Sequence, residues 1–389
     1  MGQQASPADS PFSSDEYEVR VQKALRMMET ERLDALLCYA SKIMPGNVRY
    51  FTGYETRLGI HDASFFLITP GTSPEFRLFS NATWEHPEEQ SWVSSVTLTS
   101  NFGPEIAACL SSATRRLGVA GYKYLPLSVY LGIRGRWPEM EVVDSTEPAT
   151  KLRSVKSEAE IQVLRRCAEV TDRGGKAFLN GVKVGASERE IAAEVERAMK
   201  VNGCDEVSYT TQVGCGEKTS EVVIFPSDHR VLEGEPVQVD CGATYRGYRG
   251  DFSRVTVVGR TSEEYERMLE ATAQMYLGCL EKIRPGVLAS DVARAGMEVA
   301  KAHQLDRFLY VSPNVGAGFM GHGIGCHYHE LPDINLHDHT TLEENMVVVL
   351  EPILTRPGLG GVKLEDAVRV TRTGAERLSS CELRSWANA

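Results

Sequence analysis

Hydrophobic positions in the first 150 residues alternate between helical spacing and short buried runs. Residues 20–31 have the spacing of an amphipathic helix, and the apolar run 35–39 follows them. A second apolar run, 63–68, ends at a Pro-Gly turn. The alternation continues to about Val143. This pattern predicts an α/β domain in the first part of the chain.

Helix starts in the second half are marked by Ser with Glu three positions later. Ser157 and Glu160 form such a pair, a second pair begins at Ser187, and each is followed by apolar residues at helical spacing. A third helix is expected to open at 261–264 and a fourth near Ser290.

Strand patterns lie between and after these helices. The segments 236–245 and 252–258 are rich in strand formers and are separated by a turn that contains glycine. The segments 346–354 and 361–371 form a second such pair, broken by Pro-Gly. Four helices with antiparallel strand pairs predict an α+β domain.

The length of 389 residues is typical of two or three domains. We expect a disordered polar leader at residues 1–16, an N-terminal α/β domain at 17–150, and a second domain at 151–389. The residues at 157–160 open the first helix of that second domain, which places the boundary near residue 150.

Composition and net charge limit the possible partners and indicate the cellular compartment. The formal net charge of -11 argues against a nucleic-acid partner. Nine cysteines without a C-x-x-C pair are typical of reduced thiols, and no apolar run reaches the roughly 18 residues of a membrane span. We therefore expect a cytoplasmic protein with no membrane partner.

The first six residues match the consensus for N-myristoylation at Gly2. The segment that follows is acidic rather than polybasic, so a second membrane signal is missing. A disordered leader is the preferred interpretation, and modification of Gly2 stays open.

Four carboxylates occur inside or beside apolar strands, where an uncompensated charge is costly. They are Asp240, Asp251, Glu351 and Glu365. An ion pair with Arg249 or Arg254 would account for any one of them. For all four together, ligation of divalent cations by hard oxygen donors is the better explanation.

A Gly-rich loop supplies a nitrogen donor of the kind that such a site uses. His322 is flanked by glycines, and His327 and His329 follow within eight residues. Glycine neighbours allow backbone and ligand to approach closely. A single histidine is usually structural, but three in one Gly-rich loop favour a metal or catalytic role.

These motifs in this order resemble the pita-bread metallopeptidase family, which includes methionine aminopeptidase, aminopeptidase P, prolidase and creatinase relatives. The order is Asp240, ten intervening residues, Asp251, the loop at His322, then Glu351-Pro352 and Glu365-Asp366. Residues 152–157 are similar to the segment that opens the catalytic domain of the family. Residues 47–53 are similar to a strand motif in the N-terminal domain of the prolidase and creatinase branch. The resemblance extends from about residue 17 to 373.

The resemblance implies a C-terminal pita-bread domain preceded by a creatinase/prolidase-like α/β domain. It also implies two divalent ions, with Asp240 on one, His322 on the other, and Asp251 and Glu365 bridging both. Glu351 would bind metal and shuttle a proton. His329 would contact the substrate carbonyl or its tetrahedral adduct. Mn²⁺ suits one histidine and four carboxylates well, and Zn²⁺, Co²⁺ and Fe²⁺ also fit.

The expected function is a dinuclear metal-dependent hydrolase of small peptides, of the Xaa-Pro aminopeptidase or dipeptidase type. The resemblance also implies a homodimer. The family usually carries another histidine upstream of its first aspartate, but residues 221–226 contain none. The alternative is therefore a non-peptidase member that cleaves an amide or C–N bond in a small metabolite. A catalytically inactive binding module is disfavoured, because all five metal ligands are present.

Overall fold

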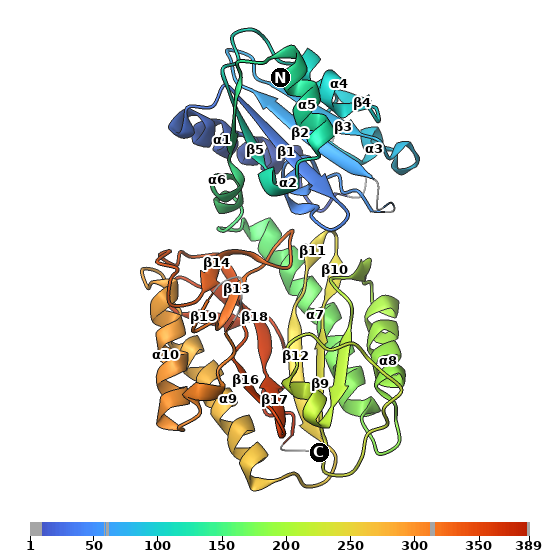
Figure 1. Cartoon of the computed structure of the whole chain (residues 1–389), viewed down its shortest axis with the longest axis vertical. Helices are drawn as coiled ribbons and strands as arrows, with labels where there is room; N and C mark the ends of the chain where they lie inside the picture. Colours follow the sequence, from blue (N-terminus) through green and yellow to red (C-terminus); the bar gives the residue numbers. More distant parts are fainter. Residues whose placement is uncertain (1–9, 58, 60–61, 312–315, 387–389) are drawn as a thin grey trace. The chain divides into compact units, whose positions relative to one another are not determined.

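The structure is a computed structural model, and it describes residues 10–57, 59, 62–311 and 316–386 (Figure 1). The chain divides into two compact units, Met1–Arg153 and Ser154–Ala389. No helix among the described residues combines the length and the hydropathy of a membrane span.

The start of the N-terminal unit differs from the expectation. Gly2 and the rest of residues 1–9 lie outside the described residues. Helix α1 (Ser14–Glu31) begins inside the expected leader, because the Ser13 side chain caps it by accepting a hydrogen bond from the Glu16 N–H. Phe12 is buried with its ring edge against Tyr17. The prediction that the leader reaches residue 16 was therefore wrong.

The N-terminal unit is built on a six-stranded mixed sheet with the order β4-β3-β2-β1-β5-β6. Pairs β1–β5, β5–β6 and β3–β4 are parallel, whereas β1–β2 and β2–β3 are antiparallel. The strands in chain order are β1 (Ala35–Ser41), β2 (Ala63–Thr69), β3 (Glu75–Ser80), β4 (Val96–Leu98), β5 (Arg116–Ala120) and β6 (Glu141–Asp144).

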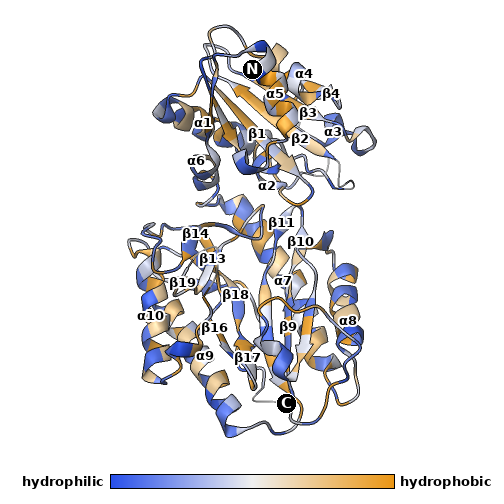
Figure 2. Cartoon of the chain, viewed as in Figure 1, coloured by the Kyte–Doolittle hydropathy of each residue, from blue (hydrophilic) through white to orange (hydrophobic). Residues whose placement is uncertain are grey.

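Helices flank this sheet, and α4 and α5 pack against one of its faces through Ile106, Val129 and Ile133. Figure 2 shows hydrophobic residues along the central strands. The helices after α1 are α2 (Gly46–Thr52), α3 (Pro87–Gln90), α4 (Phe102–Ala108), α5 (Leu127–Arg136) and α6 (Thr146–Lys151).

The segment 47–53, expected as a strand, is instead helix α2. Gly53 ends the helix in the left-handed conformation with φ 81°, and its N–H donates to the Arg49 carbonyl. The Arg49 side chain in turn donates to the Gly53 carbonyl. These local bonds at the C-terminus override the strand preference of Val48 and Tyr50.

The four helices expected in the second unit are present. Ser157 and Ser187 each form a complete capping box, with Glu160 and Glu190, and Ser262 caps the third helix. The helices are α7 (Glu158–Gly181), α8 (Glu188–Val201), α9 (Glu263–Lys282) and α10 (Ala289–Ala302).

The central sheet of this unit has the order β14-β13-β15-β18-β12-β9-β8, with β19 also pairing with β18. In chain order these strands are β8 (Gln212–Cys215), β9 (Pro236–Cys241), β12 (Phe252–Val257), β13 (Gly321–Gly323), β14 (Glu330–Ile334), β15 (Val347–Leu350), β18 (Glu365–Val370) and β19 (Ala375–Arg377). Smaller sheets are formed by β7 (Glu206–Val207), β10 (Ala243–Tyr245) and β11 (Tyr248–Arg249), and by β16 (Ile353–Arg356) and β17 (Gly360–Lys363).

Two helix pairs cover the strands, and each pair has its own hydrophobic cluster. Phe178 of α7 and Val195 of α8 belong to one cluster with Val237 of β9. Met275 of α9 and Val292 of α10 belong to the other cluster, which includes residues of β15 and β18. Figure 1 shows α7 and α8 on the side of β9 and β12, and α9 and α10 on the side of β16 and β17. The strands between the two pairs carry the polar groups of the candidate site.

Candidate metal centre

Strand register places the predicted ligands on neighbouring strands. Asp240 on β9 lies opposite Ser253 on β12, and Ser253 lies opposite Glu365 on β18. Asp251 directly precedes β12 and Glu351 directly follows β15. The sheet order β15-β18-β12-β9 therefore gathers residues that are up to 125 positions apart in the sequence.

All six predicted site residues line one cavity of about 380 Å³ in the second unit. They are Asp240, Asp251, His322, His329, Glu351 and Glu365. One ligand atom from each of Asp251, His322 and Glu365 lies within 4.8 Å of the others, which is close enough for one ion to be shared. Concave sites with a few convergent polar groups are the usual form of small-ligand sites.

His322 is oriented for ligation through Nε2. Its Nδ1 lies 2.9 Å from the Gly323 carbonyl oxygen, so Nδ1 carries the proton. Nε2 then faces the acids, 3.6 Å from Asp251 Oδ2 and 3.8 Å from Glu351 Oε2. Burial, with a further contribution from His329, holds the pKa of His322 well below its usual value. The imidazole is thus neutral, which is the form that binds metal.

The acids of the cavity are buried together without enough positive charge to balance them. Burial raises the pKa of Asp251 well above its usual value, and the charges of Asp240 and Glu351 add to the effect. Burial likewise raises the pKa of Glu365, with Asp251 and Glu351 adding to it. One Glu365 oxygen, Oε2, is buried without a hydrogen-bond partner.

This donor set fits divalent cations. Four buried carboxylates and a neutral imidazole match the oxygen and nitrogen ligands that such ions take. An orphaned buried carboxylate oxygen also indicates a missing partner. Cations bound between these groups would offset the burial and the mutual repulsion that raise the pKa of Asp251 and Glu365.

Lys363 is a charged residue of the cavity that the sequence prediction missed. Its ammonium contacts Asp240 and lies 3.2 Å from Glu351 Oε1 and 3.8 Å from Glu365 Oε2. Burial alone would lower its pKa, but the three carboxylates outweigh burial and hold the pKa well above the usual value. The available signal was its spacing, since residues two apart in extended chain share a face.

Two neutral residues also hold Asp240. The Tyr209 hydroxyl lies 2.6 Å from Asp240 Oδ1 and also contacts Asp251, and the Gln212 amide donates to Asp240 Oδ2 at 3.0 Å. Gln212 lies directly opposite Asp240 in the β8–β9 pair. A prediction of this strand pairing with its register would therefore have identified Gln212. Tyr209 lies in the connection between β7 and β8, where the sequence gives no pattern.

His329 lies at the cavity beside His322. The two imidazole rings stack with their centroids 4.3 Å apart and their planes 21° from parallel. His329 Nε2 is 2.8 Å from Asp333 Oδ1, which fixes the rotation of the ring. The side chain is partly exposed, so it can reach a molecule in the cavity.

The segment without the expected upstream histidine also reaches this cavity. Val222, Val223 and Phe225 line it, so apolar side chains occupy this part of the wall.

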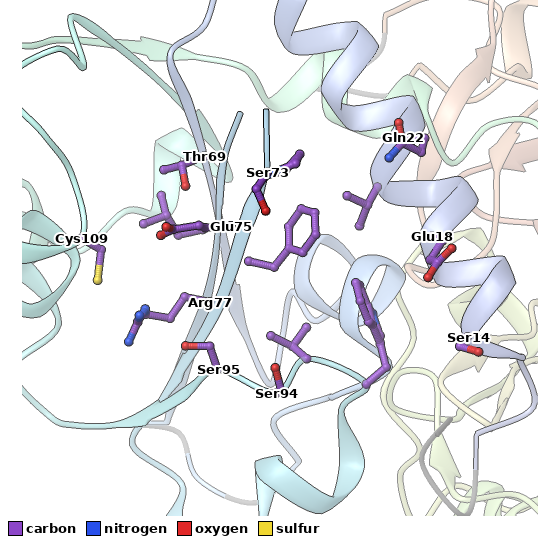
Figure 3. Close-up of a pocket in the computed structure, with 16 residues that line it drawn as sticks. Ser14, Glu18, Gln22, Thr69, Ser73, Glu75, Arg77, Ser94, Ser95 and Cys109 are labelled. Atoms are coloured by element: carbon purple, nitrogen blue, oxygen red, sulfur yellow. The ribbon is translucent and has the colours of Figure 1, made fainter. Parts of the chain in front are cut away.

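A larger cavity, of about 530 Å³, lies in the N-terminal unit. Figure 3 shows Glu75, Arg77 and Cys109 on one side of it and Glu18 and Gln22 of α1 on the other. Within the described part of the chain, the candidate metal-binding cluster is in the second unit and not in this cavity. The smaller cavity is therefore the candidate centre.

Comparison with known proteins identifies the family of each of the two domains. The model of metallopeptidase family M24 matches residues 162–372, and that of the creatinase/prolidase N-terminal domain matches residues 20–155. An Xaa-Pro dipeptidase from Pyrococcus furiosus is 28% identical over 363 residues, which are 93% of this chain and 98% of that protein.

Solved structures extend the likeness to the fold. The prolidase from Pyrococcus horikoshii superimposes with a TM-score of 0.83 at 26% identity, covering 94% of this chain and 99% of that one. The prolidase from Pyrococcus furiosus gives a TM-score of 0.80 at 29% identity, covering 92% and 99%. These findings confirm the predicted fold class and the predicted use of divalent metal. The chain belongs to metallopeptidase family M24, with a creatinase/prolidase N-terminal domain preceding the metallopeptidase domain.

Proposed function

We propose that this protein is a metal-dependent Xaa-Pro dipeptidase. The observation that carries the proposal is the convergence of four buried carboxylates and a neutral histidine in one cavity. Relatives that match nearly the whole chain are named Xaa-Pro dipeptidase and prolidase, which supports a dipeptide substrate. The small-metabolite alternative is not favoured, because these relatives cover both domains.

In this proposal the site holds two divalent ions, with Mn²⁺ as the preferred metal. Asp240, Asp251, His322, Glu351 and Glu365 would hold these ions. Bound ions supply Lewis acidity, which polarises the substrate carbonyl and lowers the pKa of water.

The remaining steps belong to the side chains of the protein. Glu351 takes a proton from the attacking water and delivers it to the leaving amine. His329, held by Asp333, contacts the substrate carbonyl oxygen or its tetrahedral adduct, where negative charge develops. Lys363, Tyr209 and Gln212 keep Asp240 in a fixed position, so that less reorganisation is needed during the reaction.

Location and assembly are part of the same proposal. We place the protein in the cytoplasm, which agrees with the nine free cysteines of the described structure. We also propose a homodimer, by analogy with the family. Light scattering of the purified protein should give about twice the mass of 42.9 kDa, and a monomer mass would refute the dimer.

The first prediction concerns the reaction itself. Purified protein with added Mn²⁺ should hydrolyse Xaa-Pro dipeptides and leave matched Xaa-Ala dipeptides largely intact. The Glu351→Ala variant should lose the activity, because it removes both a metal ligand and the proton carrier. Release of free proline measures the reaction. Equal cleavage by wild type and variant, or no cleavage of any dipeptide by metal-loaded protein, would contradict the proposal.

A further inference from the structure

A buried ion pair lies at the base of the loop that carries two histidines of the site. We call residues 322–329 the histidine loop. Lys156 Nζ is 3.6 Å from Glu330 Oε2, and each of the two side chains is 1% exposed. The cost of taking both charges out of water offsets much of their attraction, so a buried ion pair adds little to stability. The place of this pair points instead to a role in holding the loop.

Glu330 closes the histidine loop. It lies opposite Gly323 in the β13–β14 pair, where the register shifts between His322 and Gly323. Its carboxylate reaches back into the loop, because Oε1 accepts a hydrogen bond from the His327 N–H at 3.2 Å. Gly325 lies against the other oxygen, and a Cβ at this position would lie 2.6 Å from Oε2. The loop is therefore folded around the Glu330 carboxylate.

Lys156 is anchored to the central sheet. Its N–H donates to the Asn345 carbonyl at 3.0 Å, and the preceding Val155 forms a β-bridge with Met346, just before β15. Its ammonium also donates to the Ser154 carbonyl at 3.2 Å. Strand β15 is the neighbour of β13, which begins the histidine loop. The ion pair therefore ties the loop to the strand beside the one from which it emerges.

The histidine loop places two side chains whose separation matters for the proposed reaction. His322 faces the acids, and His329, directly before Glu330, lines the cavity. Their rings stack with a centroid distance of 4.3 Å. Gly323 and Gly325 lie between them and give the backbone wide conformational freedom, so contacts outside the loop must fix its path. A catalytic group misplaced by about 1 Å can cost roughly 100-fold in rate.

We propose that Lys156 and Glu330 are positioning residues for His329. Asp333 fixes the rotation of the His329 ring, and the buried pair fixes the backbone that carries it. Neither residue of the pair is part of the cavity lining, so both act through His329 and not on the substrate. This inference rests on the proposed function, since it adds two residues to the support of the same site.

Glu330→Gln and Lys156→Met each remove one charge of the pair with little change in volume. On the Mn²⁺-loaded full chain, each should lower kcat for an Xaa-Pro dipeptide by about 10- to 100-fold, with KM and metal content close to those of the wild type. The matched controls are Glu147→Gln and Lys151→Met, which remove charges from an exposed pair 2.7 Å apart. These controls should keep the wild-type rate. A wild-type kcat in both variants of the buried pair would overturn the proposal.

A second series separates positioning from a general loss of stability. In a His329→Ala background, Glu330→Gln should lower kcat no further, because the side chain through which the pair acts is already removed. A substitution that only unfolds part of the protein lowers the rate by the same factor in both backgrounds. Equal factors would therefore overturn the proposal.

Crystal structures of the Mn²⁺-loaded Glu330→Gln and Lys156→Met variants test the inference without turnover. The His329 ring should move away from His322, so that the centroid distance exceeds the 4.3 Å of the wild type. This expectation holds even if the wild type cleaves no dipeptide, a result that would refute the dipeptidase but not the positioning pair. An unchanged ring stack in both variants would refute the pair.

Discussion

Glu365→Gln is expected to lower dipeptide hydrolysis by roughly 1000-fold or more and to reduce the bound metal. The side chain is 1% exposed, and its Oε2 has no hydrogen-bond partner. Glutamine keeps the shape but removes the charge that a shared divalent ion requires. Metal analysis after gel filtration and the rate of proline release measure the two effects.

The control for this variant is Glu281→Gln, at an exposed position near the end of α9. It should keep the metal content and rate of the wild type. In the presence of a chelator the Glu365→Gln substitution should not lower the stability of the protein. The reason is that it removes the repulsion of the Glu365 charge by Asp251 and Glu351. The metal-free variant should therefore melt at or above the temperature of metal-free wild type. A Glu365→Gln protein with full metal content and full activity would contradict the ligand assignment.

Arg254→Met is expected to destabilise the second unit by about 3–5 kcal/mol. Arg254 and Asp366 are both 0% exposed, and the guanidinium donates to both Asp366 oxygens at 2.7 and 3.0 Å. It also donates to the backbone carbonyls of Glu365 and Glu382 at 2.9 and 2.8 Å. Methionine fills the volume but leaves these acceptors without this donor, and Arg377 remains as the charged partner of Asp366.

Urea denaturation of the chelator-treated protein measures this change. Arg294→Met is the control, because Arg294 forms an exposed pair with Asp291 that should contribute no more than about 1 kcal/mol. Since Arg254 bonds the Glu365 carbonyl, its loss should also weaken metal binding. A change in unfolding free energy below about 1 kcal/mol for Arg254→Met would show that the buried pair is dispensable.

The candidate metal ligands could be singled out from the sequence because their chemistry conflicts with their surroundings. Asp240 and Glu365 are acids in apolar strands, and Asp251 and Glu351 border such strands, so the sequence alone raised the question of what neutralises them. The structure brings all four, with His322, into one cavity. The helix starts at Ser157 and Ser187 could also be predicted from the sequence, because a capping box depends on residues only three positions apart.

The residues that were missed depend on contacts distant in sequence. Tyr209 reaches Asp240 and Asp251 only because β8 pairs with β9, and no local pattern marks it. In the sequence Lys363 cannot be distinguished from an ordinary exposed lysine, because its three carboxylate neighbours approach it only in the folded structure. The segment at Arg49 was expected as a strand, whereas its helix is stabilised by the left-handed Gly53.

Lys363 also reduces the electrostatic repulsion among the buried carboxylates of the site. Four carboxylates in one sheet region repel one another, and a single buried ammonium among Asp240, Glu351 and Glu365 offsets part of that repulsion. Even with this ammonium in the cavity, burial and acidic neighbours raise the pKa of Asp251 well above its usual value. The side of the site with Asp251, His322 and Glu365 is therefore where a bound cation would relieve the most repulsion.

The most direct test of the central claim is an anomalous difference map from crystals of the full-length protein grown with Mn²⁺. We predict two manganese peaks in the cavity of the second unit, bounded by Asp240, Asp251, His322, Glu351 and Glu365, with Asp251 and Glu365 between them. A map with no peak among these side chains, or with manganese bound elsewhere, would contradict the assignment of this cavity as the metal centre.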